Sequence, residues 1–312
     1  MFSTGPVWWR QQRLERAAGV ARQIVVVTDV EGSPFELGED SSLDETAGLG
    51  FLAAHGIPLV INSHRTRVEI ERLHQTLGLL TPFISEHGNA LCLPRGCFPF
   101  VPDRAQPILG REVIAFGKTH QEVVDALRIA AHEARVSIAR FSELTIDEVS
   151  RELGVTQFEA QLVKHREYTE LFRLVDDDEA ALARIVNALR RRGLRCVPHG
   201  RHHLVSAAPD PAASLQTLRK LWRLTWGDHV MIGLGDSEDD VEWLQHVDVP
   251  IIVRNGGPSV PAHALARLPA VQVSRWPGQH GWSEAIFHSV GMLLTPRGDL
   301  QIAYAERKAI EQ

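Results

Sequence analysis

Acidic residues and a serine follow three apolar runs of this 312-residue chain, and together they could carry out phosphoryl transfer. They are Asp29 and Glu31 after residues 24–28, Ser63 after 58–62, and Asp236, Asp239 and Asp240 after 229–234. A carboxylate can attack phosphorus, a hydroxyl can hold a phosphoryl oxygen, and further carboxylates bind Mg²⁺. A single aspartate after a strand is commonly a turn or a helix cap, so the prediction rests on all three groups together.

Strands and helices alternate in the pattern of a parallel sheet with crossover helices. The predicted elements are strands at 24–28 and 58–62 and helices at 44–55 and 66–77, which end at Gly56 and Gly78. Functional groups gather outside the carboxyl ends of parallel strands. We therefore expect the acidic residues and the serine to meet at one edge of this sheet.

The pattern changes between residues 92 and 196, where we predict helices at 120–134, after Thr145 and at 179–192, and a strand at 170–175. The alternation returns with a strand at 203–206, a helix at 212–226 and a strand at 229–234. The sequence thus predicts an α/β fold, a Rossmann-like doubly wound parallel sheet with an inserted α+β domain. The expected domains are an N-terminal extension (1–19), the core (20–91 and 197–295), the insertion (92–196) and a C-terminal tail (296–312).

The composition excludes several classes of partner. The chain has 33 basic and 39 acidic residues and a formal net charge of -6, with no long run of either sign, so we expect neither nucleic-acid nor membrane binding. Three cysteines without metal-ligand spacing, and the absence of any apolar stretch near the roughly 20 residues that span a bilayer, predict a cytoplasmic location. Trp8 and Trp9 are expected to pack on the protein's own surface or on a subunit partner, as in a homodimer, with a membrane interface as the alternative.

Histidines near each other in sequence do not predict a zinc site. His199, His202 and His203 are close along the chain, but a strand directs His202 and His203 to opposite faces. His64, next to Ser63, is interpreted as orienting the turn or, alternatively, as an additional polar group in the pocket.

These segments resemble the motifs of the haloacid dehalogenase superfamily. The superfamily's first motif reads Asp-x-Asp-Gly-Thr and its last reads Gly-Asp-x-x-x-Asp; they stand here as Asp29-Val-Glu-Gly-Ser33 and Gly235-Asp-Ser-Glu-Asp-Asp240. Over about residues 24–290 the chain is most similar to the mannosyl-3-phosphoglycerate phosphatase family. Further segments that carry this resemblance are 63–69, 83–89, 166–170, 233–237, 247–250 and 281–284.

The resemblance implies a Mg²⁺-dependent phosphatase of mannosyl-3-phosphoglycerate or a similar glycosyl phosphoglycerate. Asp29 would be the nucleophile and a metal ligand, and Glu31 the general acid/base and a backbone metal ligand. Asp236 would bind the metal directly, with Asp240 in support. The remaining implied residues are Gly32, Ser63 and Arg65 for the phosphoryl group, and Arg166, Tyr168 and Thr169 for the substrate, in an inserted cap. The alternative for these last three is a surface strand with a salt bridge.

Departures from the motifs leave the turnover rate open. Glu31 replaces an aspartate, which moves the carboxyl by about 1.5 Å, whereas Ser33 keeps the hydroxyl of threonine. The family's third-motif lysine is missing from Asp210-Pro-Ala212, and Arg65 or Lys164 are candidates to replace it. Arg65 could instead cap a helix or pair with Glu69, and Lys164 could be solvated. Three interpretations remain: a working phosphatase, a phosphatase of another sugar phosphate or small acid, and a relative that binds a ligand or partner without turnover.

Overall fold

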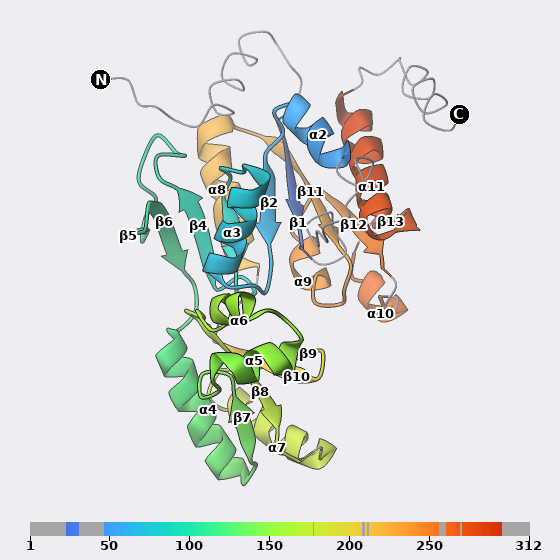
Figure 1. Ribbon diagram of the computed structural model, residues 1–312. Coiled ribbons are helices and arrows are strands. Elements are labelled where there is room, and N and C mark those ends of the chain that lie inside the picture. Colours follow the sequence, from blue (N-terminus) through green and yellow to red (C-terminus); the bar gives the residue numbers. More distant parts are fainter. Residues whose placement is uncertain are drawn as a thin grey trace. The chain divides into compact units, whose positions relative to one another are not determined.

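The computed structural model describes residues 23–30, 47–176, 178–207, 210, 212–255, 260–268 and 270–294 (Figure 1). These form two compact units, the first within residues 1–61, 96–99 and 219–312 and the second within 62–95 and 100–218. The predicted extensions at 1–19 and 296–312, with Trp8 and Trp9, lie outside the described residues. Within the described ranges, no helix is long and apolar enough to cross a membrane.

The first unit is built on parallel strands in the order β13-β12-β11-β1-β2 (Figure 1). They are β1 (Gln23–Thr28), β2 (Leu59–Asn62), β11 (His229–Gly235), β12 (Val249–Arg254) and β13 (Gln272–Pro277). Val25, Val26 and Val27 are fully buried, as expected for an apolar run in a parallel sheet covered on both faces. This arrangement confirms the predicted α/β class.

Helices α2 and α11 pack together beside this sheet (Figure 1). The helices of the unit are α2 (Ala47–Ala54), α9 (Val241–Leu244), α10 (Ala262–Leu265) and α11 (Gly278–Leu294), and α8 (Ala213–Trp226) leads into it. A Cβ at Gly48 would lie 2.8 Å from the ring of Trp282 in α11, so glycine permits the close approach of the two helices.

The second unit begins with α3 and an antiparallel group of strands in the order β3-β4-β6-β5. Its elements are α3 (Arg67–Leu77), β3 (Phe83–Ser85), β4 (Ala90–Pro94), β5 (Gln106–Ile108) and β6 (Arg111–Ala115). Helix α3 begins after Thr66 in a capping box and ends at Gly78, which has a φ of 65°, as the sequence predicts. The sequence pattern does not predict β4, β5 and β6, because prolines and glycines interrupt the alternation of this segment.

A four-stranded antiparallel sheet in the order β7-β8-β10-β9 forms the rest of the second unit. The elements here are α4 (His120–Ala134), β7 (Ile138–Arg140), α5 (Ile146–Leu153), α6 (Gln157–Val163), β8 (Thr169–Leu174), α7 (Glu179–Arg190), β9 (Arg195–His199) and β10 (His202–Ser206). Phe172 packs with residues of α4 and α7, whereas Leu171 packs with residues of α5 and α6. Neighbouring strand residues thus serve opposite faces of the sheet. The sheet has the α+β composition predicted for the insertion, but the strand at 203–206, which was expected in the core, pairs here as β10 with β8 and β9.

Candidate active site

Strands β1 and β11 place two acidic residues side by side in the first unit. The strands are parallel, with Thr28 aligned with Leu234, and the N–H of Asp29 donates to the Leu234 carbonyl over 3.0 Å. From β1 the chain crosses to β2 on one side, and it later returns to β11 on the other side. Ligands bind where the strand order reverses in this way. Asp29 and Asp236 therefore lie where parallel sheets of this kind bind ligands.

Three carboxylates form a cluster at this point. Asp29, Asp236 and Asp240 each place an oxygen within 4.8 Å of the others, and the residues are 8%, 8% and 4% exposed. Buried carboxylates at this spacing repel one another unless a cation lies among them, and Mg²⁺ prefers oxygen ligands. The donor type, burial and spacing therefore fit a divalent metal ion. In the described part of the chain, no other group of His, Cys, Asp and Glu side chains has such spacing.

Asp240 holds the loop that follows β11. Its Oδ2 accepts hydrogen bonds from the N–H groups of Asp236 and Ser237, both at 2.9 Å, and from Ser237 Oγ at 2.7 Å. Its Oδ1 accepts one from Trp243 Nε1 at 2.9 Å. Burial raises the pKa of Asp240, and these hydrogen bonds act in the opposite direction. Asp240 thus fixes the backbone that carries Asp236.

Gly235 permits this arrangement for a steric reason. A Cβ at Gly235 would lie 2.5 Å from Cβ and 2.6 Å from Cγ of Asp240. Any larger residue would therefore displace the Asp240 side chain from the loop that it holds.

Two features of the first unit were not predicted as parts of the site. Asn255, just after β12, donates from Nδ2 to Asp236 Oδ2 at 2.9 Å. Trp282 Nε1 donates to Thr28 Oγ1 at 2.9 Å, and Thr28 Oγ1 donates to the carbonyl of Asp29, also at 2.9 Å. The 281–284 segment, which contributes to the family resemblance, signals the tryptophan. For Asn255 the signal was a polar residue directly after a buried strand.

Ser63 and Arg65 lie in the second unit, in the turn after β2. Ser63 is 4% exposed, and its Oγ accepts a hydrogen bond from the N–H of Arg65 at 3.2 Å. The N–H of Ser63 donates to the Ile84 carbonyl at 3.1 Å, which fixes the turn against β3. Glu69, considered as a partner of Arg65, accepts from the N–H and hydroxyl of Thr66 at 2.8 and 2.7 Å.

Arg166, Tyr168 and Thr169 lie at the start of β8 and are 9%, 9% and 0% exposed, so the segment is not a surface strand. The fully buried Glu86 accepts hydrogen bonds from the N–H groups of Glu167, Tyr168 and Thr169 at 2.8, 3.1 and 2.9 Å. The Thr169 hydroxyl also donates to Glu86 at 2.6 Å and accepts from Arg166 Nη1 at 2.9 Å. Burial raises the pKa of Glu86, against the effect of the Arg166 charge and these hydrogen bonds. Burial also raises the pKa of Tyr168 to about 12, so its phenol stays neutral.

Lys164 is a structural element of the second unit and not a solvated side chain. Its Nζ donates to the carbonyls of Phe141, at 2.7 Å, and Leu144. Burial lowers its pKa. At the position of the third motif, Asp210 Oδ1 accepts a hydrogen bond from the N–H of Ala212 at 2.8 Å, just before α8.

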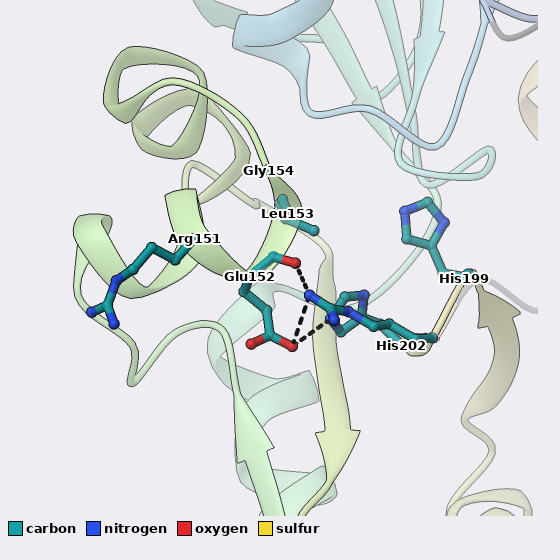
Figure 2. Close-up of a pocket in the computed structure, with 8 residues that line it drawn as sticks. Arg151, Glu152, Leu153, Gly154, His199 and His202 are labelled. Atoms are coloured by element: carbon teal, nitrogen blue, oxygen red, sulfur yellow. Dashed lines mark hydrogen bonds and ion pairs between the residues drawn. The ribbon is translucent and has the colours of Figure 1, made fainter.

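A pocket of about 520 Å³ lies between the end of α5 and the β9–β10 turn (Figure 2). The residues that line it are Arg151, Glu152, Leu153, Gly154, His199, Gly200, Arg201 and His202. Glu152 Oε1 pairs with His202 Nε2 at 3.0 Å and with Arg173 Nε at 3.3 Å. The hydrogen bond from His202 is the main reason that the pKa of Glu152 lies below its ordinary value. Figure 2 shows His199 apart from this ion-pair network.

The side chains of His202 and His203 lie on opposite faces of their sheet, as predicted. The His202 ring packs against Phe141 with centroids 5.0 Å apart, and the His203 ring against Phe172 at 5.3 Å. Phe141 and Phe172 belong to the separate clusters on the two faces.

The structure groups the predicted site residues by unit. The first unit brings together Asp29, Asp236 and Asp240. The second unit holds Ser63, Arg65, Arg166, Tyr168 and Thr169. Glu31 and Gly32 lie outside the described residues.

Two curated relatives are similar to most of the chain, although no family model matches it. One, from Persephonella marina, is named glucosyl-3-phosphoglycerate/mannosyl-3-phosphoglycerate phosphatase. It is 28% identical over 266 residues, which cover 85% of this chain and 96% of the relative. The other, from Methanococcoides burtonii, has the same name and is 28% identical over 267 residues, or 86% of this chain and 97% of the relative.

The fold is similar to that of a solved haloacid dehalogenase-like hydrolase from Bacteroides thetaiotaomicron. The TM-score is 0.58 at 16% identity, over 86% of this chain and 99% of that chain. In sequence the chain is thus similar to named phosphatases of glycosyl phosphoglycerates, and in fold to haloacid dehalogenase-like hydrolases, which confirms the resemblance that its motifs indicate.

Proposed function

We propose that this protein is a Mg²⁺-dependent phosphatase and that its substrate is glucosyl- or mannosyl-3-phosphoglycerate. The observation that carries the proposal is the cluster of Asp29, Asp236 and Asp240 at the carboxyl ends of β1 and β11. The names of the two relatives support the class of substrate.

The proposed metal ligands are the carboxylates of Asp29 and Asp236 and the backbone carbonyl of Glu31, with Asp240 in support. When bound, Mg²⁺ would offset the negative charge of the carboxylates and of the transferring phosphoryl group. Ser63, Arg65 and Gly32 are proposed to hold the phosphoryl oxygens.

In the proposed reaction the Asp29 carboxylate attacks phosphorus, and the bond between phosphorus and the leaving oxygen breaks. Glu31 gives its proton to that oxygen. Water then attacks the aspartyl-phosphate and gives its proton to Glu31. The bond between Asp29 and phosphorus breaks, so phosphate is released and the Asp29 carboxylate is restored. The N–H of Val30 donates to Asp29 Oδ1 at 2.7 Å, and this hydrogen bond supports a fixed orientation of the nucleophile.

The four-stranded α+β module, which begins in the insertion expected at 92–196 and extends to β10 at residues 202–206, is proposed as the cap that excludes water and reads the part of the substrate that is not phosphate. Arg166, Tyr168 and Thr169 are the proposed cap residues. A cytoplasmic location and a homodimer belong to the same proposal, and size-exclusion chromatography with light scattering tests the second.

A second candidate function is ligand binding without turnover. The longer Glu31 moves its carboxyl by about 1.5 Å, and a displacement of about 1 Å can reduce a rate on the order of a hundredfold. The third-motif position has no lysine, and Lys164 is bound to carbonyls of its own unit. Both observations favour slow or absent hydrolysis.

Phosphate release from a panel of phosphorylated sugars and glycosyl phosphoglycerates, with Mg²⁺ present, separates the two functions. The controls are Asp29→Asn, in the cluster, and Asp228→Asn, at an 88% exposed carboxylate. Release that only Asp29→Asn abolishes would support the phosphatase. Folded protein that binds Mg²⁺ and releases no phosphate would overturn it and leave the binding function.

A further inference from the structure

The second unit contains a group of basic side chains that the proposed reaction steps do not use. We call His64, His87 and His199 the histidine cluster. The rings of His64 and His199 lie 4.4 Å apart between centroids, and those of His64 and His87 lie 5.9 Å apart. The three histidines come from the turn after β2, the turn after β3 and the end of β9. Separate parts of the unit therefore converge next to Ser63.

The backbone at His87 is strained. His87 has a φ of 56°, between Glu86 at 50° and Gly88 at 82°. Residues with a Cβ rarely adopt this left-handed conformation, and such strain clusters at functional sites. The N–H of His87 donates to the Ser63 carbonyl at 3.2 Å, and that of Glu86 to the Arg65 carbonyl at 3.0 Å. The turn that presents His87 is therefore tied to the turn that presents Ser63.

Basic side chains are concentrated around His87. Burial lowers the pKa of His87 well below its ordinary value, and four neighbours act in the same direction: His64, His199, Arg166 and Arg195. An anion bound among these groups would offset their repulsion and favour protonated imidazole.

Arg166 adds a buried donor that lacks an acceptor. Its Nη1 donates to Thr169 at 2.9 Å and contacts the His64 carbonyl at 3.5 Å, but its Nε has no hydrogen-bond partner in the described structure. Arg166 is 9% exposed. The neighbouring carboxylate, Glu86, already accepts hydrogen bonds at both oxygens. Leaving a buried guanidinium N–H without an acceptor costs free energy that a ligand oxygen would recover.

We infer that the histidine cluster and Arg166 form an anion subsite that binds the carboxylate of the glycerate part of the substrate. The identity of the anion rests on the proposed function. His199 also lines the pocket of about 520 Å³ (Figure 2). The subsite would distinguish phosphoglycerates from sugar phosphates that lack a carboxylate.

Two small probes that differ in this group test the inference by calorimetry. They are 3-phosphoglycerate and glycerol 3-phosphate, titrated into the full-length Asp29→Asn variant with Mg²⁺. We expect 3-phosphoglycerate to bind about tenfold more tightly or better. In buffers of different ionisation enthalpy, its binding near pH 7 should show proton uptake that glycerol 3-phosphate does not show.

His199→Gln in the same background should reduce the preference for 3-phosphoglycerate to within about twofold. The control His165→Gln changes an exposed histidine and should retain the preference. If His199→Gln does not fold, His64→Gln provides the same comparison. Equal affinities for the two probes before either substitution, or a variant that loses affinity equally for both, would overturn the subsite. Failure of wild-type phosphate release would overturn the proposed function alone.

Discussion

The hydrogen bond between Trp282 and Thr28 is predicted to stabilise the end of β1 and to position Asp29. Both residues are 1% exposed, and Trp282 Nε1 donates to Thr28 Oγ1 at 2.9 Å. The threonine hydroxyl in turn donates to the Asp29 carbonyl at 2.9 Å, so the tryptophan also restrains the backbone of Asp29. Removing either partner should therefore change both stability and activity.

The expected loss of stability depends on which buried donor loses its acceptor. Thr28→Val keeps the shape of the side chain but leaves the indole N–H buried and unpaired, which costs about 1–3 kcal/mol. Trp282→Phe loses the same bond and part of a buried ring, for a loss of about 2–4 kcal/mol. In the double variant the indole is absent, so no buried N–H is left without an acceptor. Thr28→Val should thus cost about 1–2 kcal/mol less in that background.

Thermal unfolding measures these losses, at about 2–4 °C per kcal/mol for a unit of this size. Trp276→Phe, at a 53% exposed position of β13, is the matched control and should change stability by less than about 0.5 kcal/mol. The Thr28→Val enzyme should also show reduced kcat. Additive effects in the double variant, or an equal loss in Trp276→Phe, would refute the reasoning.

Three further predictions concern a glycine, a buried histidine and the metal. Gly235→Ala should destabilise the protein by about 1–3 kcal/mol, because the new Cβ would lie 2.5 Å from Asp240 Cβ. Gly50→Ala, in open space on α2, is the control and should stabilise it by about 0.5–1 kcal/mol. Denaturant unfolding that shifts the midpoints of both variants in the same direction would contradict this. Burial, and then the charge of Arg111, lowers the pKa of His74 to about 3. Between pH ~6.5 and 3, therefore, His74 takes up a proton only in the unfolded state. The free energy of unfolding should fall by about 1.4 kcal/mol for each pH unit across this range. His74→Phe should remove that part of the acid destabilisation, and parallel stability curves for variant and wild type would argue against it. Chelation of Mg²⁺ should lower the Tm of the wild type more than that of Asp236→Asn, and equal shifts would count against the metal site.

Local sequence signals predicted part of the fold, including the strands β1, β2 and β11 that carry the site. Thr66 and Gly78 bound α3 as expected, because a capping side chain and a left-handed residue act within a few positions. Helix α4 (His120–Ala134) has the predicted bounds for similar reasons. The short strands β4, β5 and β6 were missed, because their pairing depends on partner strands and not on their own alternation.

The candidate site was predictable where a functional residue directly follows an apolar strand. Asp29 and Asp236 have this position, and the parallel pairing of β1 with β11 brings them together. Glu86 was missed, because nothing near it in sequence indicates the three N–H groups at 167–169 that it binds. Such a contact, 81 or more residues apart, follows only from the tertiary fold.

The clustered carboxylates depend on donors that lie outside the phosphoryl-transfer motifs. Asp236 is held by Asn255, and the backbone around Asp29 is held by Trp282, 254 residues from the threonine that it contacts. Buried like charges destabilise the folded chain, so these hydrogen bonds and a bound cation must together offset the repulsion. The donors act by keeping the carboxylates oriented before a metal or substrate arrives. Substitutions at such supporting positions should therefore weaken metal binding and turnover even where every motif residue is retained.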